Sequence, residues 1–194
     1  MLVAILLATA AGVVYVISPN WGKHNAQAAP RNVGSVPTLH GKLVDYVSPH
    51  MIAIPKLSAK APIVKVGTQN RELDIPLDPK VVGWWDGGAR PGDRRGTAIL
   101  AGHINYSGVT GVLSRIGTLN PGDTVFVTGM HKNKKVRLKF TITGVRTYKK
   151  TVLPYRQIFD QSTAGRLAIV TCGGPFDAST GNYEDNIVAF AVPA

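Results

Sequence analysis

The sequence predicts a mainly β protein, a closed or nearly closed β-barrel with one or two short helices, preceded by an N-terminal membrane-spanning helix. Short apolar or alternating segments recur along the 194 residues, and 21 Gly and 13 Pro separate them, which favours turns and short strands over a helical bundle. An apolar fraction of 44% with 17% charged residues fits a chain that folds around a core. No heptad pattern persists, so a coiled coil is excluded.

The N-terminal segment predicts a membrane anchor. Residues 1–22 carry no charged side chain and residues 1–17 are nearly all apolar, a length that can span a bilayer. A signal peptide normally has a basic region before the apolar segment, and none is present here. We therefore prefer a retained anchor over residues 1–20 to a cleaved signal. Prolines interrupt residues 21–60, which predicts a Pro-rich linker, and residues 61–194 form the predicted barrel domain.

Six segments have apolar or alternating sequences of strand length bounded by turn residues: 63–66, 97–103, 124–128, 136–143, 167–172 and 186–192. In 136–143 every second residue is apolar, which predicts a strand with one buried face. Residues 120–123 (NPGD) are a turn signal before the third segment. The basic run 131–135 predicts a hairpin turn that leads into the fourth. Short helical segments are expected at 111–116 and 153–160.

The charge balance limits the classes of partner. The chain has 22 Lys and Arg against 11 Asp and Glu, a formal net charge of +11, which suggests an anionic partner such as nucleic acid, a membrane surface or a cell-wall polymer. No motif with a groove-entering helix or stacking aromatic residues occurs, so nucleic acid is not an expected partner. The densest basic run, residues 131–135, is interpreted as a solvated loop.

The cysteine count and the missing motifs limit the chemistry. One cysteine excludes an intramolecular disulfide framework and a multi-cysteine zinc site. Carboxylates are scattered along the chain, Glu184 and Asp185 forming only a pair, so no metal site is expected. No Gly-rich phosphate loop precedes a helix, and no cofactor is predicted.

Cys172 and His103 share a setting, because each ends an apolar strand segment. Gly173 and Gly174 follow the cysteine, and a strand that opens into a glycine turn exposes a side chain and brings backbone N–H groups near it. A thiol needs a base or a cation to become a thiolate, and histidine is the usual base near neutral pH. If the two strands are neighbours, these residues form a nucleophile and its base. The alternative is a buried structural cysteine.

Two motifs in this region resemble the sortase family of cysteine transpeptidases. The first is 98–103 (AILAGH) followed by 119–123 (LNPGD), and the second is 169–174 (IVTCGG). The most similar class is that of the actinobacterial class F sortases. Residues that support this class are Thr171–Gly174, Phe176, Asp177, Thr180, Gly181, Tyr183 and Asp185–Val188. The resemblance covers residues 63–192 approximately, and its motifs occur in the family's order.

The resemblance implies an eight-stranded sortase-type barrel at the cell membrane, with a single span and an extracellular catalytic domain. Such enzymes cleave an LPXTG-like sorting signal after its Thr through an acyl-enzyme thioester, which an amine then resolves. Cys172 is then the nucleophile, and His103 protonates the leaving amine and later deprotonates the incoming one. The implied partners are secreted proteins with a C-terminal sorting signal and an amine acceptor such as lipid II, a peptidoglycan stem peptide or a pilin.

The chain departs from the family at one position. Sortases generally carry an Arg on the strand after the cysteine, where it holds the substrate and stabilises the oxyanion, and residues 185–190 contain none. The family register puts Asn186 near that position, where its amide offers a hydrogen bond without a charge. Arg115 and Arg156 are further candidates that reach the site from loops, unless they are surface charges.

Other residues are candidates for the substrate groove. They share a place next to the nucleophile or the histidine, and they are Thr171, Gly173, Gly174 and Tyr106. For Thr171 the alternative is a strand residue that faces the barrel, and for Tyr106 it is a surface turn.

Two other functions are weighed. Cysteine transpeptidases that cross-link peptidoglycan through D-amino acids have a His two residues before the Cys, where this chain has Val170, so this class is disfavoured. A non-enzymatic alternative is a basic β-barrel module that binds anionic cell-wall polymer, with Cys172 inert in its core. A catalytic thiol reacts with an alkylating reagent in the folded state, whereas a core thiol is protected.

Overall fold

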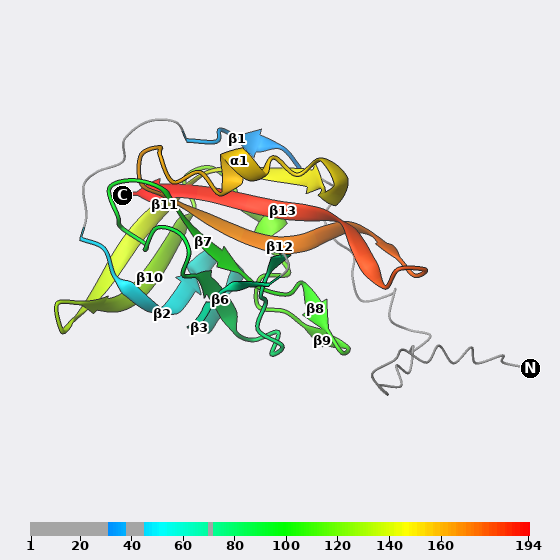
Figure 1. Cartoon of the computed structure of the whole chain (residues 1–194), viewed down its shortest axis with the longest axis horizontal. Helices are drawn as coiled ribbons and strands as arrows, with labels where there is room; N and C mark the ends of the chain where they lie inside the picture. Colours follow the sequence, from blue (N-terminus) through cyan, green and yellow to red (C-terminus); the bar gives the residue numbers. More distant parts are fainter. Residues whose placement is uncertain (1–30, 38–44, 70–71) are drawn as a thin grey trace, which may run out of the picture.

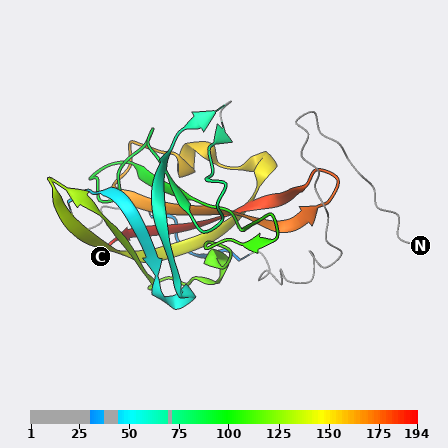
Figure 2. The same ribbon diagram turned by 90° about the horizontal axis from the view of Figure 1, so that it is seen from below.

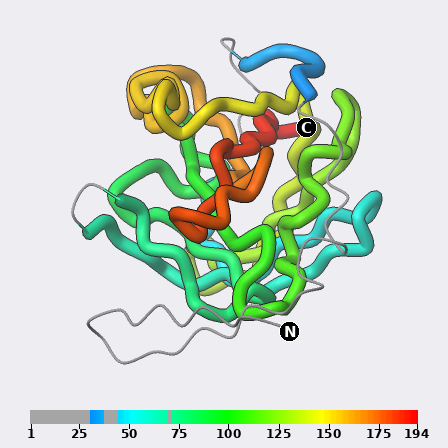
Figure 3. The backbone as a smooth tube through the Cα atoms, turned by 90° about the vertical axis from the view of Figure 1, so that its right-hand side faces the viewer, coloured from blue at the N-terminus to red at the C-terminus, as the bar shows by residue number. Residues whose placement is uncertain are grey.

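Nine strands form one sheet in the computed structural model, which describes residues 31–37, 45–69 and 72–194. The strand order is β1-β11-β10-β2-β3-β6-β7-β12-β13, and a further pairing joins β11 to β13. Eight strands therefore close into a barrel, while β1 (Val33–Gly34) adds to one end of β11. Figure 3 views this ring from the end at which the β12–β13 hairpin projects.

The elements have the following bounds. The barrel strands are β2 (Ser48–Ile54), β3 (Ala59–Val66), β6 (Val82–Trp85), β7 (Thr97–Ala101), β10 (Thr124–His131), β11 (Lys134–Lys149), β12 (Arg166–Asp177) and β13 (Asn182–Pro193). Two small hairpins lie outside the barrel sheet, β4 (Thr68–Gln69) with β5 (Glu72–Leu73) and β8 (Asn105–Tyr106) with β9 (Val109–Thr110). The helical turns are η1 (Pro55–Leu57), η2 (Ile116–Thr118), η3 (Lys150–Val152) and α1 (Tyr155–Ile158).

Strand alternation gives the barrel two apolar faces. The interior cluster holds residues of every barrel strand, among them Ile52, Ile63, Val82, Leu100, Val127, Phe140, Leu167 and Ala189. A second cluster lies on the outer face and consists of Ile99, Ile158, Ala168, Val188 and Phe190. Figure 1 shows α1 above β12 and β13, where its Ile158 belongs to this outer cluster. Strands β7, β12 and β13 are thus covered on both sides, which explains their continuous apolar sequences.

The predicted mainly β architecture is confirmed, with all six predicted strand segments in barrel strands. The two predicted turns are also present. Lys132 and Asn133 have φ of 45° and 63°, which is the conformation of a tight two-residue hairpin turn between β10 and β11. Asp123 donates its N–H to the Asn120 carbonyl at 3.1 Å, which closes the turn before β10. The helix predicted at 153–160 is shortened to α1 at residues 155–158, whereas 112–115 is turn and the helical turn η2 begins only at residue 116.

The barrel begins earlier than residue 61. Strand β2 lies within the segment expected to be a linker and pairs with both β3 and β10. Two prolines make this segment resemble a linker, Pro49 within β2 and Pro55 directly after it, and each occupies a position compatible with the sheet. Pro49 lies opposite Gly129, directly after a register shift, and Pro55 begins η1.

The expected N-terminal span over residues 1–20 lies outside the described residues, as does much of the expected linker. Within the described ranges, no helix has both the length and the apolar character needed to cross a bilayer.

The β12–β13 hairpin continues past the barrel. Figures 1 and 2 both show these two strands running side by side across the molecule and projecting together at one end. Their register shifts between Gly173 and Phe176, so the projecting part begins directly after Cys172. The two candidate catalytic residues, His103 and Cys172, lie at this end of the sheet.

We predict that Leu167→Ala lowers the free energy of unfolding by about 2–5 kcal/mol, because Leu167 is fully buried in the interior cluster and the substitution leaves a cavity. Leu77→Ala is the matched control, since Leu77 is 72% exposed and such surface changes stay within about 0.5 kcal/mol. Urea denaturation followed by circular dichroism measures both. Equal effects of the two substitutions would contradict the assignment of β12 to the barrel core.

Candidate active site

The candidate site lies where β7 and β12 end side by side. These strands are parallel neighbours, and their last pair is Val170 with Ala101. His103 and Cys172 each follow that pair by two residues. Because strand residues two apart share a face, both continue the row of outer-face residues that includes Ile99 and Ala168. The structure therefore brings together the two residues that the sequence analysis paired.

Two hydrogen bonds fix the ends of these strands against each other. The Gly102 N–H donates to the Val170 carbonyl at 3.1 Å. The Thr171 hydroxyl donates to the Gly102 carbonyl at 2.8 Å. Thr171, expected in the substrate groove, instead lies on the interior side and is 2% exposed. Its contact ties the residue before Cys172 to the residue before His103, and so it fixes the spacing of the two side chains.

The imidazole of His103 is half-buried and stacks on Tyr106, with ring centroids 4.8 Å apart and planes inclined by 24°. The ring donates a hydrogen bond to the Pro76 carbonyl. Its Nε2 is buried and has no partner among the described residues, so Nδ1 is the nitrogen that carries the donated proton. This bond leaves the Nε2 lone pair as the group available for proton transfer. Burial lowers the pKa of His103, and the Pro76 contact partly opposes that change.

Cys172, Asn186 and Tyr148 lie side by side on the neighbouring strands β12, β13 and β11. Cys172 pairs with Asn186 of β13, which pairs in turn with Tyr148 of β11. Residues opposite each other in antiparallel strands project to the same face, and Tyr148 packs against the outer cluster. The Asn186 side chain makes no hydrogen bond within the described residues, so its amide is a free donor beside the thiol. Burial raises the pKa of Tyr148, which keeps its phenol protonated.

A glycine turn follows the thiol and rests on a buried carboxylate. Gly174 has φ of +74°, a left-handed conformation that favours glycine. A side chain at Gly174 would also collide with the Asp185 carboxylate. Asp185 is 6% exposed, and its Oδ1 has no partner among the described residues. The turn is therefore restricted to glycine, and the Asp185 carboxyl group lies directly beneath it.

The β8–β9 hairpin forms one side of the site. Its Tyr106 covers the His103 ring, and the Asn105 side chain donates to the Tyr183 hydroxyl of β13 at 2.9 Å. This bond connects the segment after His103 to the hairpin after Cys172. Tyr106, Gly173 and Gly174 thus all lie next to the catalytic candidates, and their place in a substrate groove stays a prediction.

The two arginine candidates lie at the start of η2 and in α1, outside the strands that carry this group. Arg115 caps the start of η2, whose Ile116 belongs to the interior cluster, whereas Cys172 lies on the outer face. Arg156 is exposed on α1, which covers the outer face at Ala168, four residues before the cysteine on β12. Neither side chain makes a hydrogen bond or an ion pair within the described part of the chain.

Three neighbours of the site have no role there that the sequence alone predicts: Pro76, Tyr148 and the buried Asp185. For Asp185 a signal exists, because it alternates with Ile187 and Ala189 and therefore falls on the interior face of β13. For Pro76 and Tyr148 the chain gives no such signal, since loop contacts and the barrel-closing β11–β13 pairing bring them in. No group of three or more His, Cys, Asp or Glu residues that suits a metal ion occurs in the described ranges.

We predict that His103 titrates below its usual value of 6.5 in the folded protein, because burial disfavours the imidazolium. The unfolded chain then takes up this proton at a higher pH than the native state does. The free energy of unfolding should therefore fall as the pH drops through 6.5 towards the native pKa. NMR titration of the His103 ring measures the first effect. Urea denaturation at several pH values measures the second, which should be absent in His103→Gln; an equal pH dependence in that variant would contradict the assignment.

Comparisons with known proteins agree with this architecture. The SrtA sortase from Actinomyces oris superposes with a TM-score of 0.56 at 23% identity, over 84% of this chain and 89% of that one. Sortase E1 from Streptomyces coelicolor, solved with a tripeptide in its active site, gives a TM-score of 0.56 at 21% identity, over 80% and 88% of the two chains. SortaseC1 from Streptococcus suis gives 0.57 at 15% identity, over 75% and 72%.

These solved structures represent several sortase classes, and at such identities they establish the fold. No curated protein sequence matches the chain significantly. The sortase domain family model matches residues 52–194, a range that begins within β2 and contains every other strand of the barrel. Because this match covers well over half of the chain, the protein belongs to the sortase family.

Proposed function

We propose that this sortase is a cysteine transpeptidase in which Cys172 is the nucleophile and His103 the acid and base. The observation that carries the proposal is the parallel β7–β12 pairing, which ends two residues before both side chains. A nucleophile and a base at adjacent strand ends are the minimum that acyl transfer needs. The same arrangement disfavours the alternative of an inert core thiol, since Cys172 lies on the outer face and is only half-buried.

The proposed reaction has two stages. In the first, the Cys172 thiolate attacks the carbonyl carbon of the substrate Thr, and the carbonyl π electrons move onto oxygen. The C–N bond then breaks, and the leaving amine takes a proton from the His103 imidazolium, which leaves a thioester. In the second stage His103 removes a proton from an incoming amine, which attacks the thioester carbon and releases Cys172. Nε2 suits the proton transfer, since Nδ1 is held by the Pro76 carbonyl.

The groups around the thiol have roles in this scheme. Backbone N–H groups of the Gly173–Gly174 turn are suited to bind the oxyanion, and the free Asn186 amide beside Cys172 adds a donor. Tyr106 forms a wall of the groove next to His103. Arg115 and Arg156, the arginines considered above, would need to cross from the barrel end or from α1 to take part.

The substrate, class and location follow from the sequence motifs. We propose that the protein is of class F and cleaves an LPXTG-like sorting signal of secreted proteins. The acceptor amine is that of lipid II, a peptidoglycan stem peptide or a pilin. In this proposal the apolar segment 1–20 anchors the enzyme in the cell membrane by a single span. A linker then connects this span to the barrel, which lies outside the cell.

The proposal is tested with purified full chain in detergent, an LPXTG peptide and hydroxylamine as the amine. We expect cleavage after Thr, a hydroxamate product and a mass adduct on Cys172, the one cysteine of the chain. Cys172→Ala should lose the adduct and at least about 10³-fold in rate. His103→Ala should lose a similar factor, while His50→Ala, which changes a histidine of β2 away from the site, should not.

Other outcomes separate the alternatives. A thiol that iodoacetamide does not modify in the folded state, together with no cleavage, would overturn the transpeptidase proposal and favour a basic module that binds wall polymer. A reactive thiol without cleavage of any peptide of a library would reject the sorting-signal substrate but retain the nucleophile.

A further inference from the structure

We infer that Lys150 is the cation of this active site, and that its ammonium group stabilises the Cys172 thiolate and the oxyanion of the substrate carbonyl. The inference rests on the proposed transpeptidase function. The residues on the two strands beside the thiol, Asn186 and Tyr148, are neutral and supply no positive charge. The Asp185 carboxyl group is buried beneath the following turn and offers no positive charge.

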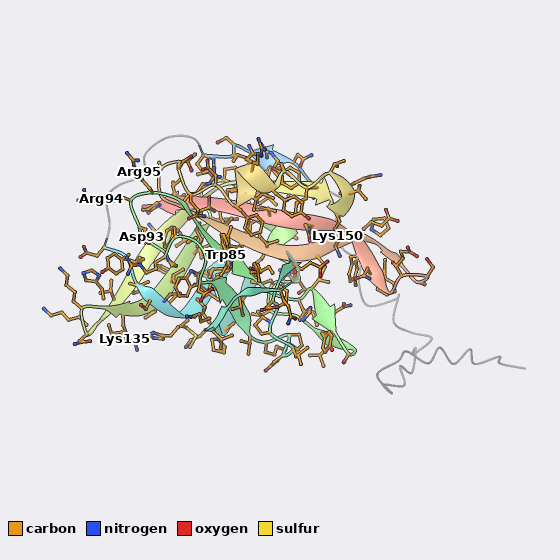
Figure 4. The ribbon with its side chains drawn as sticks, viewed as in Figure 1. Trp85, Asp93, Arg94, Arg95, Lys135 and Lys150 are labelled. Atoms are coloured by element: carbon orange, nitrogen blue, oxygen red, sulfur yellow. The ribbon has the colours of Figure 1, made fainter. Side chains whose placement is uncertain are left out.

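The strand register places Lys150 beside the thiol. Tyr148 is two strands away from Cys172, about 10 Å given the usual strand spacing. Lys150 follows Tyr148 by two residues, and the intervening Lys149 is extended, with φ of −60° and ψ of 136°. Tyr148 and Lys150 are both half-buried whereas Lys149 is exposed, which places Lys150 on the face of Tyr148 and Cys172. Figure 4 labels Lys150 beside the bend at which β12 and β13 leave the barrel.

The side chain of Lys150 is available for such a role. It is half-buried, and within the described ranges it makes no hydrogen bond and no ion pair. A partly buried ammonium without a partner costs free energy unless an anion completes the site. Its flexible four-carbon stem can cover much of the distance across β13 to the reacting carbonyl.

Two other cations near this face, Arg146 and Arg166, are already engaged in hydrogen bonds. Arg146 donates to the Val33 carbonyl at 2.6 Å and to the Gly34 carbonyl at 2.5 Å, which holds β1. Arg166 is 5% exposed and donates to the Thr97 hydroxyl and to two backbone carbonyls at the opposite end of β12. Figure 4 shows Arg94, Arg95 and Lys135 at the far end of the molecule.

The proposed contribution of Lys150 is electrostatic and involves no proton transfer. Negative charge develops on sulfur before the attack and on the carbonyl oxygen during it, and a cation in a partly desolvated site favours both. The other ionisable groups around the thiol are Tyr148 and Lys149 of β11, Glu184 and Asp185 of β13, and His103 after β7. Of these, only Lys149 and a protonated His103 carry positive charge.

The test compares Lys150→Met, Lys150→Arg and the matched control Lys149→Met in the full chain. Lys149 is exposed and carries the same charge one residue earlier. The first readout uses the thiol alone, as the ratio of alkylation rates by anionic iodoacetate and neutral iodoacetamide. We expect Lys150→Met to lower this ratio by about three- to tenfold at low salt, with a smaller effect at high salt. Lys150→Arg should retain the wild-type ratio, and so should Lys149→Met.

The second readout is acyl-enzyme formation with the LPXTG peptide. Lys150→Met should slow acylation by about 10²-fold with KM nearly unchanged, as expected for a group that acts on the oxyanion, and Lys150→Arg should restore most of the rate. An unchanged reagent ratio in a folded Lys150→Met protein would overturn the inference. So would an equal loss in Lys149→Met, which would indicate that the effect depends on the general positive charge of this segment and not on Lys150.

The two proposals fail in different ways. If the wild-type chain cleaves no peptide, the transpeptidase proposal fails, yet the iodoacetate ratio still decides whether Lys150 faces the thiol. If cleavage depends on Cys172 and His103 but the ratio and the acylation rate are insensitive to Lys150, the transpeptidase proposal stands and the cation lies elsewhere. Circular dichroism and urea denaturation of each variant confirm that it is folded.

Discussion

The parallel pairing of β7 with β12 is the constraint on which the site depends. Most neighbours in this barrel are antiparallel, and only this pair and β3–β6 run in the same direction. Parallel strands bring their carboxyl ends to the same edge of a sheet, so the residues that follow them emerge together. His103 and Cys172 lie far apart in sequence, and this geometry makes them neighbours. Closure of the barrel through β11 and β13 then holds both strands in a fixed register.

The two faces of the sheet divide the work between stability and chemistry. Interior residues such as Leu100 and Leu167 form the core, and Thr171 on that side joins the two strands that carry the candidates. Outer residues continue an apolar surface from Ala168 to the thiol and then change to Asn186 and Tyr148. A peptide that lies along this surface would pass from an apolar floor to the reacting groups. The polar residues appear where α1 no longer covers the strands.

The sequence predicts the parts of this arrangement that depend on local pattern. Alternation at Val136–Ile142 and the continuous apolar segments that precede His103 and Cys172 identify the strands, and the turns at Asn120–Asp123 and Lys132–Asn133 follow from residue type. The sequence does not predict β2, because Pro49 and Pro55 resemble linker residues until the register shift and the helical turn that accommodate them are visible. Contacts made by loops and by barrel closure, such as those of Pro76 and Tyr148, depend on tertiary structure that no local pattern encodes.

The hydrogen bond between Thr171 and Gly102 joins residues 69 positions apart in the chain. Contacts of this separation form only after a large loop has closed, and the entropy of that closure slows folding. The hairpins β2–β3, β10–β11 and β12–β13 connect residues near in sequence and are free to form earlier. We therefore expect the two candidate residues to meet late in folding, so that a partly folded chain would hold an intact thiol and an intact imidazole yet no pair of neighbouring groups.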